Sequence, residues 1–257
     1  MFNILIQYHP LIVCIARAYE AIGIKCKFFS TESIFDLISE FKPMIIIVLS
    51  NNTNRAFVKA CCENPWIKVI LIGTIENEFT HQLVNSGIKT GRILSLRPSA
   101  DIVSFNGGIG QPHLKCKYLI CESNTPQISQ IIYDNKLNEA ISIRMYGQGW
   151  SGYGACGITS DNMLKDLLVS SEIFITSRTE LILNAILCIS KVVHPNSLYN
   201  LSNIYKTCEE ANQVGYNNID IGEICSKHSS FHVASEILQS VDIDIRHKIP
   251  KIECKNV

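Results

Sequence analysis

Three glycines that follow a predicted strand are the first feature of the chain that could carry chemistry. Ala140–Met145 is apolar and β-branched, and the stretch YGQGWSG after it contains the pattern G-x-G-x-x-G at Gly147, Gly149 and Gly152. In dinucleotide-binding folds this pattern forms a tight turn that runs straight into a helix, whose N-terminus binds the pyrophosphate. Here the next predicted helix begins only near Ser160, so the loop needs another explanation.

A second group of polar side chains lies where a predicted strand, Ile173–Thr176, meets a predicted helix. Ser177, Arg178 and Glu180 stand at that junction. A helix N-terminus offers free N–H groups and partial positive charge to a phosphate, and an arginine there can bind phosphate through two parallel hydrogen bonds. A carboxylate close by can accept hydrogen bonds from ribose hydroxyls. The junction therefore predicts a nucleoside diphosphate site at the carboxyl end of the strand.

The order of these features along the second half of the chain resembles a known family. The features are the loop YGQGW at 146–150, the junction SRTE at 177–180 with its helix, the strand KVVHP at 191–195 and the segment SKHSSFHVASEIL at 226–238. Their order is similar to that in the CgeB-like (spore-maturation protein) group of retaining-type GT-B glycosyltransferases. The resemblance covers roughly residues 116–240, and the first half matches only in general architecture.

This resemblance implies transfer of a sugar from a UDP- or GDP-linked donor to an acceptor hydroxyl, without a metal ion or another cofactor. The acceptor stays open between a glycan, a protein and a modified DNA base, so a nucleic acid enters only as an acceptor. In the family the C-terminal half binds the nucleotide-sugar donor. The matching positions are Gly147, Gly149 and Trp150 in a loop near the nucleotide, Ser177 and Arg178 at the diphosphate, and Glu180 at the ribose or sugar.

Departures from the family pattern keep a rival class of function open. The family has R-x-F-E where this chain has Arg178-Thr179-Glu180, and Leu187-Cys188-Ile189 lacks the glycine that follows the family's helix. These departures favour a non-catalytic binding or assembly protein that kept the GT-B fold. A flavodoxin-like or Rossmann-type oxidoreductase is a second rival, and it predicts bound NAD or flavin.

Two residues of the first half are candidates for the base that activates the acceptor hydroxyl. His9 follows the first predicted strand, in QYHPL, and Glu76 follows the fourth. The loops after parallel strands face the ligand, and an imidazole or a carboxylate can take a proton from a hydroxyl. Each residue also has a simpler explanation, because His9 could cap a helix start and Glu76 could be a first-turn carboxylate.

The sequence offers no convincing metal site. His228 and His232 are four residues apart, a spacing that can bind metal, but no third ligand is near them in the sequence. Asp242 and Asp244 mimic the D-x-D of metal-dependent sugar transferases, yet they follow the last predicted helix rather than a central strand. The 11 cysteines form no C-x-x-C, which favours reduced and mostly buried thiols.

Strands and helices alternate along the chain, which predicts an α/β fold of two Rossmann-like domains, GT-B-like, facing a central cleft. The glycine-rich stretch Asn106–His113 predicts a hinge between an acceptor-side domain at 1–108 and a nucleotide-sugar-binding domain at 109–257. The predicted strands are Phe2–Gln7, Lys25–Phe29, Pro43–Leu49, Trp66–Ile72, Arg92–Leu96, Asp101–Phe105, Tyr118–Cys121, Ala140–Met145, Ile173–Thr176 and Lys191–His194. The predicted helices include Pro10–Ile22, Asn54–Glu63, Thr125–Asn135, Ser160–Ser170, Glu180–Ile189, Leu198–Gln213 and Phe231–Val241.

Composition narrows the class of protein further. The 257 residues are 47% hydrophobic and 18% charged, enough apolar material for a substantial core. Lys plus Arg and Asp plus Glu number 23 each, which gives no support for a whole-chain nucleic-acid or membrane binder. We find neither a signal peptide nor an apolar run of the roughly 18–20 residues that span a bilayer, so we expect a cytoplasmic protein. The richness in Ile, Asn and Lys suggests a compact, viral or phage-like genome.

Overall fold

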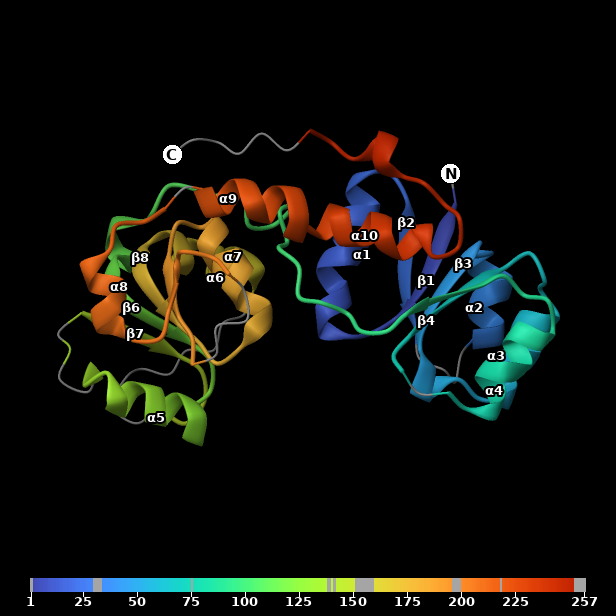
Figure 1. The fold of residues 1–257 in the computed structure, drawn as a ribbon, viewed down its shortest axis with the longest axis horizontal. Helices are drawn as coiled ribbons and strands as arrows, with labels where there is room; N and C mark the ends of the chain where they lie inside the picture. The colour runs from blue at the N-terminus through green and yellow to red at the C-terminus, as the bar shows by residue number, and fades with distance from the viewer. Residues whose placement is uncertain are drawn as a thin grey trace. The chain divides into compact units, whose positions relative to one another are not determined.

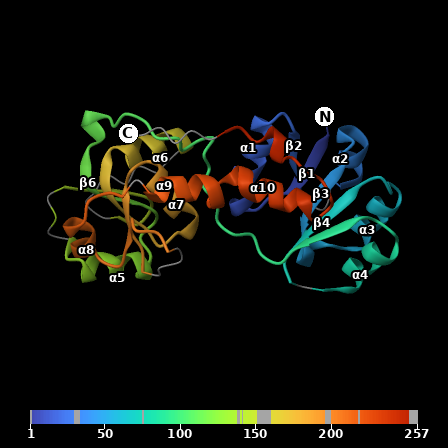
Figure 2. The same ribbon diagram turned by 45° about the horizontal axis from the view of Figure 1, so that its top comes forward.

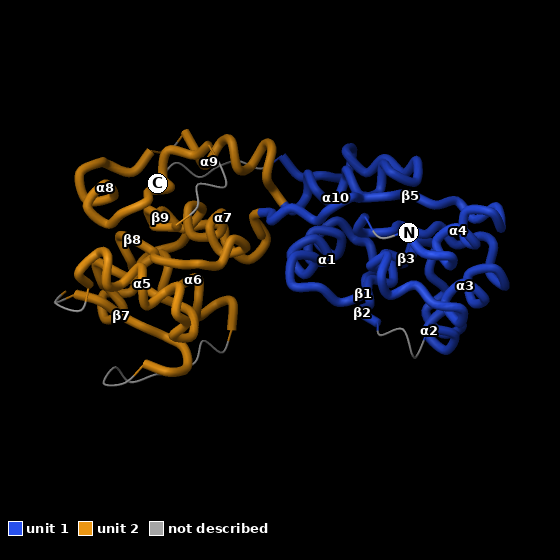
Figure 3. Tube along the Cα trace, turned by 60° about the horizontal axis from the view of Figure 1, so that its bottom comes forward, with its two compact units in different colours: residues 1–99, 230–251 blue, residues 100–229, 252–257 orange. Residues whose placement is uncertain are grey.

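The computed structural model describes residues 2–29, 34–74, 76–137, 140, 142–150, 160–195, 200–217 and 219–251. The chain forms two compact units, residues 1–99 with 230–251 and residues 100–229 with the C-terminal end (Figure 3). Each unit contains its own five-stranded parallel sheet with flanking helices (Figure 1). The predicted α/β fold of two Rossmann-like domains is confirmed.

The sheet of the first unit has the strand order β2-β1-β3-β4-β5. Its strands are β1 (Asn3–Gln7), β2 (Lys25–Phe29), β3 (Ile45–Leu49), β4 (Lys68–Ile72) and β5 (Thr90–Ile93). One face of this sheet packs against α2 (Ile34–Phe41), α3 (Arg55–Cys62) and α4 (Glu78–Asn85). The helices α1 (Val13–Ala21) and α10 (Ser230–Gln239) lie side by side in both views (Figures 1 and 2).

The sheet of the second unit has the strand order β10-β9-β8-β6-β7. Its strands are β6 (Cys116–Cys121), β7 (Ile143–Tyr146), β8 (Ser171–Ile175), β9 (Lys191–Val193) and β10 (Ile204–Tyr205). Its two faces pack against α6 (Asp161–Val169) with α7 (Thr179–Leu187), and against α5 (Pro126–Asp134) with α8 (Cys208–Gln213). Strand β7 pairs with one edge of β6, and β8 pairs with the other edge. The direction in which successive strands are added to the sheet therefore reverses between β6 and β8.

Side-chain caps explain why three of the predicted helices start where they do. Asn54, Thr125 and Ser160 each adopt extended backbone angles, and each side chain accepts a hydrogen bond from the backbone N–H three residues later. Such a bond satisfies one of the donors that a helix leaves unpaired at its start. The predicted helix starts at these residues are therefore confirmed.

Two predicted elements are wrong. Asp101–Phe105 forms a turn instead of a strand, because the Asp101 side chain accepts the Ser104 N–H and the Asp101 carbonyl accepts the Phe105 N–H. In place of one helix over Leu198–Gln213, the structure has β10 followed by α8, with 196–199 outside the described residues. The buried Asp220 carboxylate binds the Asn203 N–H at 2.8 Å, which holds the chain before β10 out of a helix.

The two units divide the chain differently from the expected boundary at 108/109. The stretch 106–113 belongs to the second unit, where the Gln111 side chain donates to Asp166 at 2.9 Å and Lys165 donates to Asn106 at 2.7 Å. After α9 (Ile219–Glu223) and the π-helix Ile224–His228, the chain returns to the first unit as α10. The chain therefore passes between the units near residues 99/100 and 229/230.

The described cysteines carry free thiols. Burial raises the pKa of Cys61, Cys188 and Cys208 to about 12. These three thiols therefore stay protonated at neutral pH and are poor metal ligands and nucleophiles. Among the described residues, no helix combines the length and the apolar character needed to cross a lipid bilayer.

We predict that Tyr19→Phe lowers the free energy of unfolding by about 1 kcal/mol, the usual contribution of one hydrogen bond. The fully buried Tyr19 hydroxyl donates to the Ala234 carbonyl at 2.9 Å and so joins α1 to α10. Urea denaturation measures the change. The matched control is Tyr133→Phe, because the Tyr133 side chain is 73% exposed. Equal stability of both variants would show that this bond contributes nothing to the attachment of α10.

Candidate functional site

The carboxyl ends of β6, β7 and β8 meet at one edge of the second sheet and surround a pocket of about 460 Å³. Ligands of open parallel sheets bind at such an edge, where the strand order reverses. Its volume falls within the usual range for small-molecule sites, roughly 300–1,000 Å³. The residues that line it are Cys121, Glu122, Ser123, Thr125, Tyr146, Gly147, Ser177 and Arg178.

The buried carboxylate of Glu122 joins the two strands on either side of this reversal point. Glu122 directly follows β6, and Ser177 lies just beyond β8. One Glu122 oxygen accepts the Ser177 backbone N–H at 2.7 Å, and the other accepts the Ser177 hydroxyl, also at 2.7 Å. The sequence interpretation gave Glu122 no role. The signal that could have found it is its place, the first polar residue after a buried strand at the start of the second alternation.

The glycine-rich loop packs against the peptide of Glu122. Gly147 has φ +140°, and a Cβ atom added to it would lie 2.6 Å from the Glu122 carbonyl carbon, so only glycine fits. The Trp150 indole N–H donates to the Glu122 carbonyl at 2.9 Å. Gly149, with φ +83°, keeps the loop beside Asn124, whose N–H donates to the Gln148 carbonyl at 2.8 Å. The two glycines therefore permit close packing of one loop on another; Gly152 lies outside the described residues.

The arginine of the strand–helix junction stands at the start of α7, as the sequence predicts. Arg178 is the residue before the first helical turn, and its N–H donates to the buried Thr176 hydroxyl at 3.0 Å. Its guanidinium donates to one oxygen of Glu180 from two nitrogens, at 2.8 Å and 2.7 Å. The Arg178 side chain is still 47% exposed, so it can turn toward a ligand. Contact of Arg178 with a diphosphate, and of Glu180 with a ribose, stays a prediction.

A buried histidine completes the surroundings of Ser177. His194 follows β9, and its Nε2 lies 3.3 Å from the Ser177 carbonyl oxygen. It is only 2% exposed. The Ser177 peptide is therefore held from two sides, by Glu122 at its N–H and by His194 at its carbonyl. In the sequence, His194 is visible only as part of the segment KVVHP, which gives no hint of this contact.

The structure places His9 at the end of β1 with a capping contact. His9 precedes the short 3₁₀ helix Pro10–Ile12, and its Nδ1 accepts the Leu11 N–H at 3.2 Å. This contact is the capping role that the sequence left open for His9. A role of His9 in proton transfer stays a prediction.

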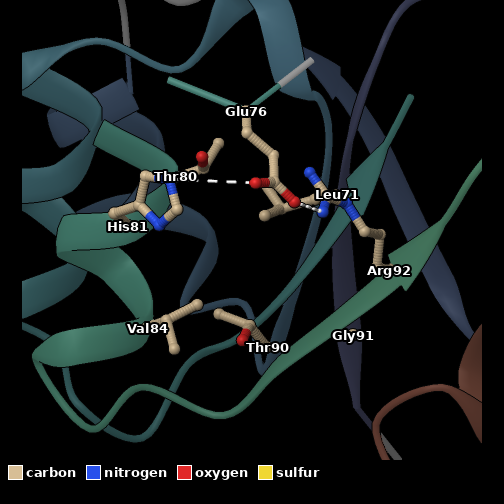
Figure 4. A pocket seen from close by; sticks show the side chains of 8 residues that line it. All are labelled: Leu71, Glu76, Thr80, His81, Val84, Thr90, Gly91 and Arg92. Carbon is tan, nitrogen blue, oxygen red and sulfur yellow. Dashed lines mark hydrogen bonds and ion pairs between the residues drawn. The ribbon is translucent and has the colours of Figure 1, made fainter. Parts of the chain in front are cut away.

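Glu76 lies in a small pocket of the first unit, about 110 Å³ in volume, between Arg92 and His81 (Figure 4). Its carboxylate pairs with the Arg92 guanidinium, and His81 Nε2 lies 3.9 Å from its other oxygen. The hydrogen bond from Arg92, reinforced by the arginine's charge, lowers the pKa of the Glu76 carboxyl. A carboxylate with a lowered pKa is a weaker base. His9 is not among the residues that line this pocket.

The acidic and histidine pairs noted in the sequence form no metal site among the described residues. No group of three Cys, His, Asp or Glu side chains converges there in a way that could hold an ion. Asp242 pairs with Lys89 at 2.6 Å, and Asp244 pairs with Arg246 at 2.7 Å. His232 lies 3.3 Å from Glu236.

We predict that Gly147→Ala lowers the free energy of unfolding of the second unit by about 1–3 kcal/mol, the usual cost of a strained backbone position. The added methyl group would meet the peptide of Glu122, and that peptide cannot move aside without breaking the Trp150 contact. The control is Gly215→Ala, since a Cβ atom there would meet nothing within 4 Å. Chemical denaturation compares the two variants, and equal stability would contradict the close packing of the loop.

No family model matches the chain, and no curated protein matches it. Solved structures that align with it include UDP-GlcNAc 2-epimerase from Neisseria meningitidis bound to UDP-GlcNAc, at 9% identity over 93% of this chain and 98% of that chain, with a TM-score of 0.48. S. aureus MnaA with UDP has 9% identity, coverage of 94% and 92%, and a TM-score of 0.47. Anabaena HepE with UDP and glucose has 11% identity, coverage of 94% and 96%, and a TM-score of 0.42. These likenesses are too distant to carry an argument about the activity of this chain.

Proposed function

We propose that the chain is a GT-B-type glycosyltransferase that takes a sugar from a UDP- or GDP-linked donor and transfers it to an acceptor hydroxyl. One observation carries the proposal: the pocket at the carboxyl edge of the second sheet has Arg178 and the start of α7 on its rim. The resemblance of the surrounding motifs to the CgeB-like group supports the same conclusion. The second unit is then the donor-binding unit.

The chemistry of transfer depends on stabilising the leaving diphosphate. As the bond between the sugar and the diphosphate breaks, negative charge builds up on the diphosphate oxygens. The Arg178 guanidinium and the N–H groups of the first turn of α7 are positive groups that can meet this charge without a metal ion. For Arg178 to do so, its bonds to Glu180 must lengthen or be shared with the ligand.

A non-catalytic binding protein is the second candidate, and a specific observation favours it. Both groups expected to bind the donor phosphates already have partners within the chain, Ser177 with Glu122 and Arg178 with Glu180. A protein that kept the GT-B fold but lost catalytic activity would keep such contacts because they stabilise the fold. Calorimetry against UDP, GDP and their sugars, combined with a donor-hydrolysis assay, separates the candidates, because a binding protein retains the ligand without turning it over.

We predict that Arg178→Ala weakens binding of the nucleotide sugar about ten- to a hundredfold, which corresponds to the loss of one charge-assisted hydrogen bond, about 1.5–3 kcal/mol. Arg178→Lys should recover only part of the affinity, because lysine keeps the charge but not the two-pronged geometry. Calorimetric titration with UDP and GDP sugars gives the measurement.

The control for this variant is Arg246→Ala. Arg246 also pairs with a carboxylate two residues away, Asp244, but it lies in the first unit, and its side chain is 70% exposed. This control should bind the donor as the unmodified protein does. Wild-type affinity in Arg178→Ala would mean that the donor site has been placed wrongly, and loss of folding would mean that Arg178 serves only the start of α7.

We also predict that turnover needs no divalent metal. In the proposed mechanism, Arg178 and the N-terminus of α7 supply the positive charge at the diphosphate, so a metal ion is not needed there. Activity should be the same in EDTA and in manganese. Activity that EDTA abolishes and manganese restores would contradict this mechanism.

A further inference from the structure

The buried carboxylate of Glu122 limits which part of a ligand can lie at Ser177. Glu122 is 9% exposed, and its two oxygens take both the N–H and the hydroxyl of Ser177. The sequence interpretation placed Ser177 at the donor diphosphate. A phosphate placed at Ser177 would therefore find its hydrogen bonds already used, and it would meet a negative charge of its own sign.

Glu122 is also held in place through its backbone. Its carbonyl accepts the Trp150 indole N–H, and Gly147 packs directly on its peptide. A buried carboxylate that left Ser177 would lose two charge-assisted hydrogen bonds and would have to find new ones. The arrangement is therefore a fixed part of the pocket wall to which a ligand must conform.

A carboxylate fixed in this position can bind ligand groups that donate hydrogen bonds, such as hydroxyls. Each carboxylate oxygen can accept about two hydrogen bonds, and the contacts to Ser177 use one on each oxygen. The remaining positions can accept hydroxyl groups. We propose that Glu122 is a specificity-determining residue, which accepts hydroxyl groups of the ligand's ribose or sugar and keeps phosphate away from Ser177. This inference rests on the proposed nucleotide-sugar site.

The diphosphate then lies on the Arg178 side of the pocket. Arg178 is the cationic side chain among the residues lining the pocket, and it stands at the start of α7, a helix of nine residues. The Leu181 N–H donates to the Arg178 carbonyl at 3.3 Å, and the N–H groups of Thr179 and Glu180 have no acceptor within the helix. The residues that follow Ser177 therefore bind the phosphate groups, and Ser177 holds the Glu122 carboxylate in place.

The test is Glu122→Gln, which keeps the shape and one acceptor oxygen but removes the charge. In calorimetric titrations we expect affinity for UDP or GDP and their sugars to fall about tenfold, since a neutral acceptor is weaker than a charged one. Affinity for inorganic pyrophosphate, which carries no sugar hydroxyls, should stay the same or rise. A loss seen with the nucleoside diphosphate alone identifies the ribose as the source of the hydroxyls, and a loss confined to the nucleotide sugar identifies the sugar.

The control variant is Glu172→Gln, an exposed glutamate at the opposite end of β8, which should bind every probe as the unmodified protein does. Unchanged or higher nucleotide affinity in Glu122→Gln would overturn the inference, because it would show that the carboxylate competes with the ligand. If the unmodified protein binds none of the probes, the proposed function itself fails.

A second variant keeps the inference testable if Glu122→Gln does not fold. Ser177→Ala retains the backbone bond to Glu122 and removes only the hydroxyl. Pyrophosphate affinity should be unaffected in this variant. A tenfold loss of pyrophosphate affinity would show that the Ser177 hydroxyl binds phosphate, and the inference would be wrong.

Discussion

The pair of hydrogen bonds between Glu122 and Ser177 is the interaction on which the candidate site depends. It bridges β6 and β8 where the strand order of the second sheet reverses, the point at which parallel sheets leave an open crevice. The glycine-rich loop reaches the same point through Trp150 and Gly147. The loop after β8 meets the carboxylate of Glu122, and the loop after β7 meets its backbone carbonyl, so Glu122 sets the geometry of the pocket wall more than any residue of the motifs does.

The local features of the fold could be predicted from the sequence because they depend on neighbours in the chain. Continuous apolar runs gave the central strands, and Asn54, Thr125 and Ser160 marked helix starts through bonds only three residues long. The turn at Asp101–Phe105 is a local failure, whereas the other failures depend on distant partners. Asp220 determines the structure before β10, and the return of α10 to the first unit depends on its packing beside α1. No spacing within either segment carries that information.

In the candidate site, too, the residues found from the sequence depend on neighbours in the chain, and the residues missed depend on distant partners. Arg178 and Glu180 were found because a strand–helix junction is visible in the sequence, and the structure places them there. Glu122 and His194 were missed because each acts on Ser177 across the sheet, 55 and 17 residues away in the chain. His9 and Glu76 were selected for residue type and position after a strand. In the structure their partners are the Leu11 N–H and the Arg92 guanidinium, contacts that residue type alone does not show.

The charges around the pocket limit how a diphosphate could bind. Among the described residues at this edge of the sheet, the carboxylates of Glu122 and Glu180 lie near one guanidinium, that of Arg178. The starts of α5 and α7 add roughly half a positive charge each, so the local charge is close to zero before a ligand enters. A diphosphate must therefore draw Arg178 away from Glu180 or share it, and binding exchanges one ion pair for another. Under the proposed function, such an exchange would give modest affinity and ready release of the diphosphate after each transfer.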